Sequence, residues 1–197
     1  MSVAHLQKWD VTAIEIALDL ETHRVSDLSR SVFSGPAQPR ICLVACFVLS
    51  PQLKRIMAAV DRAVPARLPS GLRIAPAPAR SAPLAVAAVS LQPMLALLRL
   101  QSKLVRAIEP GLANDVISLR VRHEMDEATT RFVGDFISSK TLPTFEPTFA
   151  AADFDAIELT AIGITIYHLG RAGAPQSILA HWPYPRSADG LHLRGGP

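Results

Sequence analysis

The feature that most limits the fold of this chain is an apolar segment at residues 39–48, which reads Pro-Arg-Ile-Cys-Leu-Val-Ala-Cys-Phe-Val. A run of this length, rich in β-branched residues and followed by Ser50-Pro51, predicts a buried central strand. Arg40 sets one cation into the start of the run. Because a charge in such surroundings must be paired or solvated, Arg40 is expected either to bind an anionic ligand or to pair with a nearby Asp or Glu.

A second segment, residues 145–151, has a related pattern and reads Phe-Glu-Pro-Thr-Phe-Ala-Ala. In both segments a proline is followed by alternating side chains that lead into an apolar stretch. We expect the two segments to face each other across one cleft, with the rest of the chain holding them in place.

Periodicity and turn residues predict the other elements. Strands are expected at residues 11–19, 84–91, 116–122, 159–169 and 177–184, with an edge strand or extended loop at 72–82 because of Pro76 and Pro78. Helices are expected at residues 21–33, 50–64, 93–109 and 126–138, the second capped by Ser50 and the third well buried because its leucines cover more than one side. This order predicts an α+β fold with mixed or antiparallel sheets and helices packed outside.

Composition limits the classes of partner. A net charge of +3 without any Lys/Arg run does not favour nucleic-acid binding. No apolar run reaches the ~20 residues that span a bilayer, and the N-terminus lacks the apolar core of a signal peptide, so a cytoplasmic protein with no membrane contact is expected. Residues 1–185 are expected to form one domain, and the glycine-rich residues 186–197 a loose tail.

The two cysteines, Cys42 and Cys46, lie on the same predicted strand. At about 3.3 Å per residue they would be about 13 Å apart, which is too far for a disulfide. No histidine lies near them at ligand spacing, so no metal site is expected, and no other motif indicates a cofactor. Two buried thiols in a reducing compartment are the expected state.

Several stretches together resemble one known family. They are the two proline-led segments, residues 13–16, 97–104 and 166–170, and Ala180-His181-Trp182. In pattern and order the chain resembles the two-histidine (2H) phosphoesterase superfamily, which includes the 2′-5′ RNA ligase-like proteins and cyclic nucleotide phosphodiesterases. The resemblance covers nearly the whole chain and implies two pseudo-symmetric lobes around a central cleft, each lobe carrying one His-apolar-Ser/Thr-apolar motif on a central strand.

Both motifs are changed in this chain. In the first, Arg40 occupies the histidine position and Cys42 the Ser/Thr position; in the second, Thr148 and Ala150 occupy these positions. The separation of the two motifs, 148 − 40 = 108 residues, suits two lobes of one such fold. An alternative first copy at residues 88–91 also lacks a histidine.

These changes bear directly on the family's reaction. In the family, one imidazole removes a proton and the other supplies one while a phosphodiester is cleaved. Arginine stays protonated and cannot act as a base, and a threonine hydroxyl is neither a useful acid nor a useful base at neutral pH. Each lost acid–base partner is worth roughly 10²–10⁴ in rate, so hydrolysis of 2′,3′-cyclic phosphates by the family mechanism is expected to be absent.

The residues expected to line the cleft follow from the two motifs and from nearby polar positions. They are Arg40, Cys42, Arg120, Arg122, Thr148, Ala150 and Tyr167. Cys42 is expected either as a thiol activated by the cation or simply as a buried residue. Glu15, His168 and His181 belong to no paired constellation that the sequence supports.

Three functions remain open. The first is a non-hydrolytic binder of an anionic small molecule or nucleotide, which needs an open cleft and an unpaired Arg40. The second is an enzyme repurposed for a different reaction on a more apolar substrate, of the isomerase or cyclase type, which needs a polar group with a perturbed pKa in the cleft. The third is a pseudoenzyme that binds a protein partner, which should expose an apolar patch elsewhere.

Overall fold

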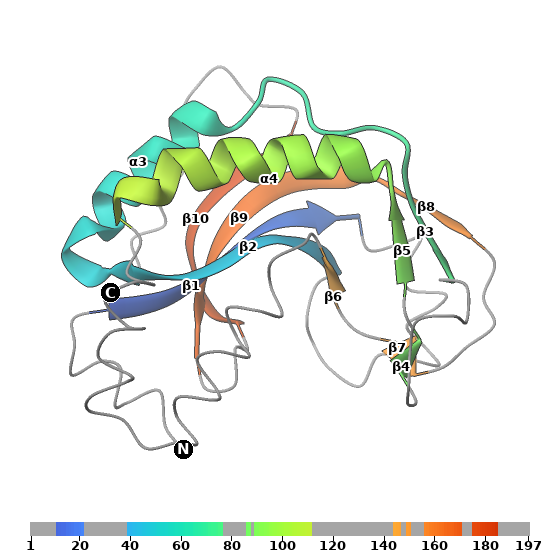
Figure 1. Cartoon of the computed structure of the whole chain (residues 1–197), viewed down its shortest axis with the longest axis horizontal. Coiled ribbons are helices and arrows are strands. Elements are labelled where there is room, and N and C mark those ends of the chain that lie inside the picture. Colours follow the sequence, from blue (N-terminus) through green and yellow to red (C-terminus); the bar gives the residue numbers. More distant parts are fainter. Residues whose placement is uncertain are drawn as a thin grey trace.

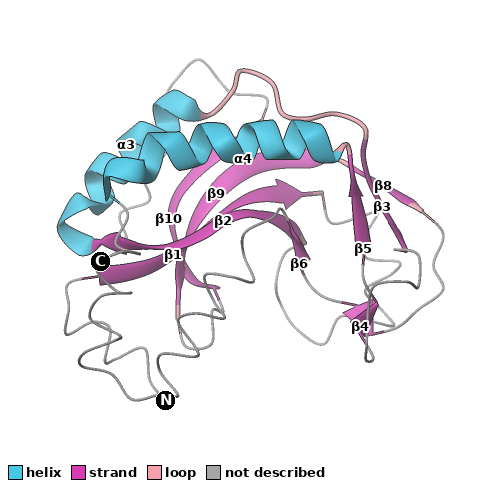
Figure 2. Ribbon diagram, in the orientation of Figure 1, coloured by secondary structure: helices cyan, strands magenta, loops and turns pink. Residues whose placement is uncertain are grey.

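The chain has an α+β fold of antiparallel strands and helices, in agreement with the predicted class (Figures 1 and 2). The computed structural model describes residues 11–21, 39–76, 86–87, 89–111, 144–146, 149–150, 156–170 and 175–184. The predicted helices at 21–33 and 126–138, the strand at 116–122 and the tail at 186–197 lie outside these ranges.

The largest layer is a five-stranded sheet of order β10-β9-β1-β2-β6, in which all neighbours are antiparallel. Its strands are β1 (Val11–Leu20), β2 (Arg40–Leu49), β6 (Thr144–Glu146), β9 (Ala161–Leu169) and β10 (Pro175–Pro183). The predicted strands at 11–19, 39–48 and 177–184 are therefore confirmed to within three residues. The run at 39–48 is buried because β2 lies inside the sheet, between β1 and β6.

Two helices cover one face of this sheet, as Figure 1 shows. They are α3 (Leu53–Ala63) and α4 (Met94–Ile108), which pack against each other, and α4 also contacts β2. The core between helices and sheet contains the even-numbered residues of β1 and one stripe from each helix. Its members include Ile14, Ile16, Leu18, Ile56, Val60, Leu97, Leu100, Leu104, Ile164 and Ile166.

An irregularity in β2 helps to fix the position of α4. The register with β1 shifts between Ile16 and Ala17, so that Leu43 is an extra residue on β2. A backbone group at such a bulge still needs a hydrogen-bond partner. The side-chain amide of Gln101 on α4 donates to the Leu43 carbonyl oxygen at 2.6 Å, which joins the helix to the sheet at this point.

Both helices differ from the sequence expectation, α3 at its start and α4 in how much of it is buried. A 3₁₀ turn, η1 (Ser50–Gln52), precedes α3, and Ser50 does not cap the helix. Its hydroxyl lies 2.9 Å from that of Thr12 at the start of β1 instead. In α4 one stripe is buried while Leu95 is 62% exposed, so the helix is amphipathic rather than buried all round. A second 3₁₀ turn, η2 (Glu109–Gly111), follows it.

The remaining strands form two small antiparallel sheets. One has the order β5-β3-β8, with β3 (Leu72–Pro76), β5 (Val89–Gln92) and β8 (Ile157–Leu159), and the other pairs β4 (Val86–Ala87) with β7 (Phe149–Ala150). The edge strand or extended loop predicted at 72–82 is wrong for residues 72–76, because β3 pairs with β5 on one side and with β8 on the other. Residues 77–82 lie outside the described residues. The strands expected at 84–91 and 159–169 are each divided between two sheets.

The first proline-led segment and residues 145–146 of the second are neighbours in one sheet, whereas Phe149–Ala150 of the second segment lie in β7, in a separate sheet. The prediction that the segments face each other across a cleft is therefore wrong for residues 40–42 and 145–146. Residues Arg40 to Cys42 pair with Glu146 to Thr144. The backbone of β2 needs hydrogen-bond partners on both sides, and β6 supplies them on the side away from β1. The described elements establish the α+β class. They do not by themselves show two pseudo-symmetric lobes.

Candidate functional site

The face of the five-stranded sheet opposite α3 and α4 carries a group of polar side chains. Strand alternation places the odd-numbered residues of β1 on this face, which we call the polar face. The register sets Arg40 and Gly163 opposite Asp19, Tyr167 opposite Glu15, and His181 opposite Thr165. We call six of these residues the polar cluster: Glu15, Asp19, Arg40, Thr165, Tyr167 and His181. Four of them (Glu15, Asp19, Arg40 and Thr165) are the buried polar residues of the described chain.

Arg40 pairs with Glu15. Its Nε donates to Glu15 Oε1 at 2.9 Å and its Nη2 to Oε2 at 3.2 Å, which is the two-pronged geometry of strong guanidinium–carboxylate pairs. Both residues are buried, with 6% of Arg40 and 1% of Glu15 exposed. Of the two states that the sequence left open for Arg40, the paired state is therefore the one found.

Tyr167 lies between the ion pair and Asp19. The Arg40 guanidinium carbon is 5.6 Å from the centre of the Tyr167 ring, within the range of a cation–π contact. The Tyr167 hydroxyl donates to Asp19 Oδ1 at 2.9 Å. Burial, followed by the charge of Asp19, raises the pKa of Tyr167 well above its ordinary value, so this hydroxyl remains a donor at neutral pH.

A short chain of hydrogen bonds connects Asp19 to His181 through Thr165. The Thr165 hydroxyl donates to Asp19 Oδ2 and lies 2.7 Å from His181 Nδ1, which is itself 3.5 Å from Asp19 Oδ2. An ionised carboxylate only accepts, and a hydroxyl has one proton. The tautomer that fits this direction is the one in which His181 Nδ1 carries the proton shared with Thr165.

This assignment has a chemical consequence. A neutral imidazole protonated on Nδ1 has its lone pair on Nε2. The His181 side chain is 39% exposed, whereas the carboxylate that orients it is 3% exposed. The arrangement therefore presents a base with a fixed tautomer, held from behind by a buried carboxylate, which is the relation of base and orienting acid in many hydrolytic and isomerising sites.

Gly163 on β9 makes room for the imidazole. A methyl group added at this position would lie 2.8 Å from His181 Cε1 and 3.0 Å from the Trp182 carbonyl oxygen. Contacts this short do not occur between ordinary side chains. The ring of His181 therefore sits against the bare backbone of Gly163, opposite Asp19 in the register.

The polar cluster holds two carboxylates and one guanidinium, so with a neutral imidazole at His181 it carries one net negative charge. Arg40 offsets Glu15 through two of the three guanidinium nitrogens. An anionic ligand on this face would meet the remaining charge of Asp19. The cluster is therefore suited to a ligand without negative charge and to the transfer of a proton.

The structure places some of the residues predicted for the site on the polar face, places one elsewhere, and leaves three undescribed. Arg40, Cys42 and Tyr167 lie on the polar face, all buried. Ala150 lies on β7, opposite Val86. Thr148, Arg120 and Arg122 fall outside the described residues.

The sequence analysis missed four members of the polar cluster. Glu15 has a partner, so the statement that it belongs to no paired constellation is wrong, and His181 is not isolated. Asp19 and Thr165 were not singled out. A signal for two of them was present, because Glu15 and Asp19 are separated by four residues on a strand and so share a face with Ala17 between them.

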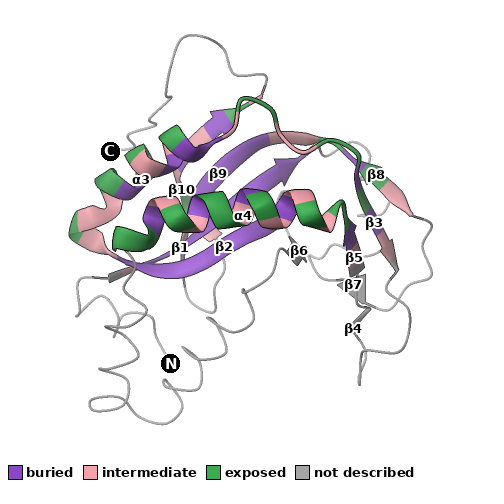
Figure 3. Cartoon of the chain, turned by 45° about the horizontal axis from the view of Figure 1, so that its top comes forward, coloured by how far each residue is buried: buried purple, intermediate pink, exposed green. Residues whose placement is uncertain are grey.

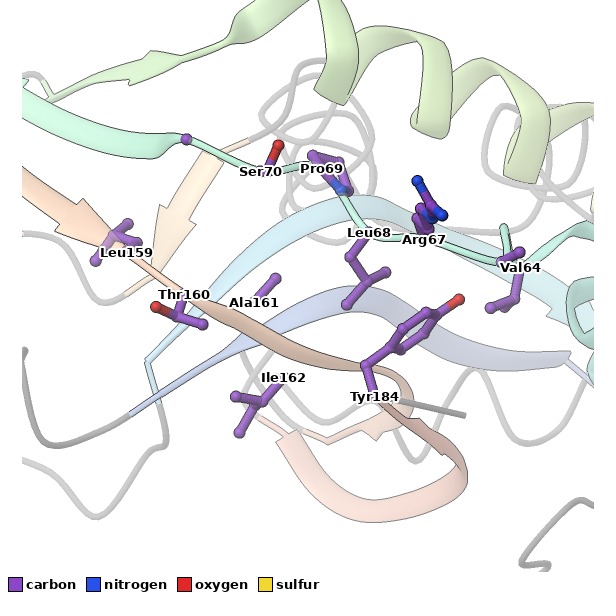
Figure 4. A pocket seen from close by; sticks show the side chains of 12 residues that line it. Val64, Arg67, Leu68, Pro69, Ser70, Leu159, Thr160, Ala161, Ile162 and Tyr184 are labelled. Carbon is purple, nitrogen blue, oxygen red and sulfur yellow. The ribbon is translucent and has the colours of Figure 1, made fainter. Parts of the chain in front are cut away.

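A pocket of about 1000 Å³ lies elsewhere, between the α3–β3 connection and the start of β9 (Figure 4). Leu68 points toward Tyr184 in this view, and Thr160 to Ile162 form the opposite wall. Its lining residues include no His, Cys, Asp or Glu. The pocket has room for a ligand but offers none of these acid–base groups, and it shares no residue with the polar cluster.

The cysteines are buried and unbridged. Burial raises the pKa of the Cys46 thiol to about 12, which makes it a poor nucleophile at neutral pH. The described residues contain no group of three or more His, Cys, Asp or Glu that could hold a metal ion.

No family model matches this chain, and no curated protein matches it. Within the part of the chain that the structure describes, no helix has the length and apolar character needed to cross a membrane.

Proposed function

We propose that the protein is an enzyme that transfers protons on a small uncharged substrate, with His181 as the acid–base group. The observation that carries this proposal is the hydrogen-bond chain from His181 Nδ1 through Thr165 to Asp19. It sets the imidazole tautomer and leaves Nε2 as the base. Asp19 stabilises the imidazolium once a proton has been taken up.

An isomerisation fits this arrangement without any co-reactant. His181 Nε2 removes a proton from one substrate atom, the bonding electrons shift within the substrate, and the same nitrogen returns the proton to another atom. Protons and electrons balance within the substrate and one side chain. The net negative charge of the polar cluster disfavours an anion, and the apolar Ala17 beside it favours an uncharged, weakly polar molecule.

Deuterium incorporation tests this proposal with a panel of candidate substrates. The protein is incubated in D₂O with a set of small carbonyl compounds and other compounds with weakly acidic C–H bonds, and mass spectrometry reports which gain deuterium. The wild type should label at least one compound, and His181→Gln should label none above the uncatalysed rate. Equal labelling by both proteins, or by neither, contradicts the proposal.

Thr165→Val is the matched variant for the role of the tautomer. Valine has nearly the shape of threonine but lacks the hydroxyl, so Nδ1 loses its acceptor while the packing is kept. We expect the labelling rate to fall about 10–100-fold, on the scale of one misplaced acid–base partner. Nitrogen-15 NMR should show the Nδ1-protonated form in the wild type and a mixture of tautomers in the variant.

Descent from the 2H phosphoesterases is part of the same proposal. Its support is the position of Arg40 and Cys42, which occupy the first motif and lie on the polar face with Tyr167. Residues that replace a catalytic motif are expected to keep the motif's place on the face of the former site. Two lobes around a cleft are the architecture that this descent requires. Neither Arg40 nor Cys42 replaces the lost imidazole, so 2′,3′-cyclic nucleotides should remain uncleaved in a chromatographic assay.

A second function, binding of an anionic small molecule or nucleotide at Arg40, has one observation in its favour. Arg40 is buried against the Tyr167 ring, a setting that strengthens any charge interaction it makes. Such a ligand must displace Glu15. Glu15→Gln removes the competing charge, so thermal shifts with nucleotides and carboxylates should grow in this variant if Arg40 is an anion site, and stay at zero if His181 chemistry is the function.

A further inference from the structure

The outer surface of α3 and α4 is strongly basic. Figure 3 shows exposed positions of both helices on the side turned away from the sheet. Six of these exposed positions are cations, which we call the basic helical face: Lys54, Arg55, Arg62, Arg99, Lys103 and Arg106. No ion pair joins them to an acidic side chain among the described residues.

Among the residues that the structure describes, acidic side chains are nearly absent from the same surface. Asp61 is the one acid within the two helices, and it is half-buried and accepts a hydrogen bond from Trp182 Nε1 at 2.8 Å. Glu109, in the turn after α4, is exposed at the edge. The two helices therefore carry six exposed cations against one half-buried acid.

The cations of α4 share their stripe with an exposed apolar side chain. Leu95, Arg99, Lys103 and Arg106 follow one another at spacings of four, four and three residues, which is one side of a helix. Leu95 is one of two large apolar residues that are exposed in the described chain. A cationic stripe that ends in an exposed leucine combines charge with an apolar anchor.

We infer that the basic helical face docks on an anionic lipid surface. Basic side chains on one face are attracted to anionic headgroups, and an apolar side chain on that face enters the interface. Nucleic acid is less well matched, because neither helix contains an aromatic residue on which bases could stack and a phosphate backbone offers nothing to Leu95. Contact of this kind needs neither a spanning segment nor a signal peptide, so the sequence argument against a membrane, which considered these two features, does not apply to it.

Vesicle co-sedimentation of the full chain tests the inference. Vesicles of phosphatidylcholine alone are compared with vesicles that also contain phosphatidylserine, at low and at physiological salt. Binding should require phosphatidylserine and weaken as salt is added. Binding that is equal on both vesicles, or absent from both, overturns the inference.

Single substitutions locate the contact. One basic side chain near an anionic surface corresponds to about fivefold in affinity, so Arg99→Gln should weaken binding about fivefold, and Arg99→Gln/Lys103→Gln/Arg106→Gln about 100-fold. Arg73→Gln is the matched control, since Arg73 is exposed on β3, outside this face, and it should change nothing. Equal losses for Arg99→Gln and Arg73→Gln overturn the inference.

Leu95→Ser separates a lipid surface from another polyanion. It should weaken vesicle binding further while leaving the circular dichroism spectrum unchanged, because Leu95 is not part of the core. A random-sequence DNA duplex serves as competitor at the same salt. Tighter binding of the duplex than of the vesicles, together with an unchanged affinity for Leu95→Ser, would assign the face to nucleic acid instead.

Discussion

The two faces of the five-stranded sheet are both buried, but different interactions stabilise them. On the face covered by α3 and α4, the even-numbered residues of β1 pack against apolar stripes of the two helices. On the polar face, the odd-numbered residues Glu15 and Asp19 of the same strand enter an ion pair and a hydrogen-bond network. Strand β1 therefore contributes apolar side chains to one face of the sheet and charged side chains to the other.

This difference shows where chemistry can reside. Apolar burial is non-directional and tolerates small rearrangements. A buried polar network is directional, and each of its members depends on the others. The polar face can therefore hold a histidine in one tautomer, whereas the helix-covered face can only hold elements together. Substitutions on the two faces should consequently differ in kind as well as in size.

The largest effect is expected on the polar face, from Arg40→Ala. The substitution leaves Glu15 buried without its partner, and removal of one member of a buried pair costs about 3–5 kcal/mol. Urea denaturation should report this loss of unfolding free energy at neutral pH. The double variant Glu15→Gln/Arg40→Met, which removes both charges, should recover most of it. A loss below about 1 kcal/mol for Arg40→Ala would mean that the pair contributes little.

The helix-covered face is tested by two leucines of α4. Leu97 is fully buried and Leu95 is 62% exposed. Leucine to alanine changes helix propensity by the same small amount at both positions, so a difference between the two variants reports the effect of burial. Leu97→Ala should lower the free energy of unfolding by about 2–5 kcal/mol through lost packing and a cavity. Leu95→Ala should change it by less than about 0.5 kcal/mol. Similar losses at both positions would contradict the orientation of α4.

A smaller effect is expected where the backbone of β9 meets His181. Gly163→Ala places a methyl group 2.8 Å from His181 Cε1, and forced contacts of this kind cost about 1–3 kcal/mol. The ring should move away from Thr165, which NMR of the imidazole nitrogens would detect. In a His181→Ala background part of the cost should disappear, and an unchanged cost there would show that the Trp182 carbonyl oxygen alone sets it.

The smallest effect at neutral pH concerns Cys46. Burial raises the pKa of its thiol in the folded protein from 9.0 to about 12, so the unfolded chain loses the thiol proton first. Stability from this group is complete below pH 9 and falls as the pH rises from 9 toward 12. Iodoacetamide at pH 8.5 should modify Cys46 only after urea unfolding. Rapid modification of the folded protein would show that the thiol is accessible.

Much of the sheet could be predicted from local pattern. The alternation at residues 11–19 and the apolar run at 39–48 predict β1 and β2 nearly to the residue, because period-two burial is written into the sequence. Strand partners are harder to predict. The prolines in residues 72–82 indicate an edge strand, yet β3 ends at Pro76 and pairs on both sides.

The candidate site could be predicted only in part. Arg40 stands out because a cation in an apolar run needs an explanation, and its two allowed states are clear from the sequence. The choice of Glu15 as its partner, 25 residues away, depends on the pairing of β1 with β2. His181 looks isolated in the sequence because Asp19 and Thr165 are 162 and 16 residues away from it along the chain.

Local pattern in the sequence was enough to predict β1, β2 and β10, and to show that Cys42 and Cys46 on one strand are too far apart for a disulfide. The fold, by contrast, sets the pairing of Arg40 with Glu15 and joins Asp19, Thr165 and His181 in one hydrogen-bond chain. It also decided that six scattered cations share one helical surface. Hydrophobic periodicity is a property of one segment and can be recognised from that segment alone. Hydrogen bonds and ion pairs form between segments, and their partners depend on the strand register that the fold sets.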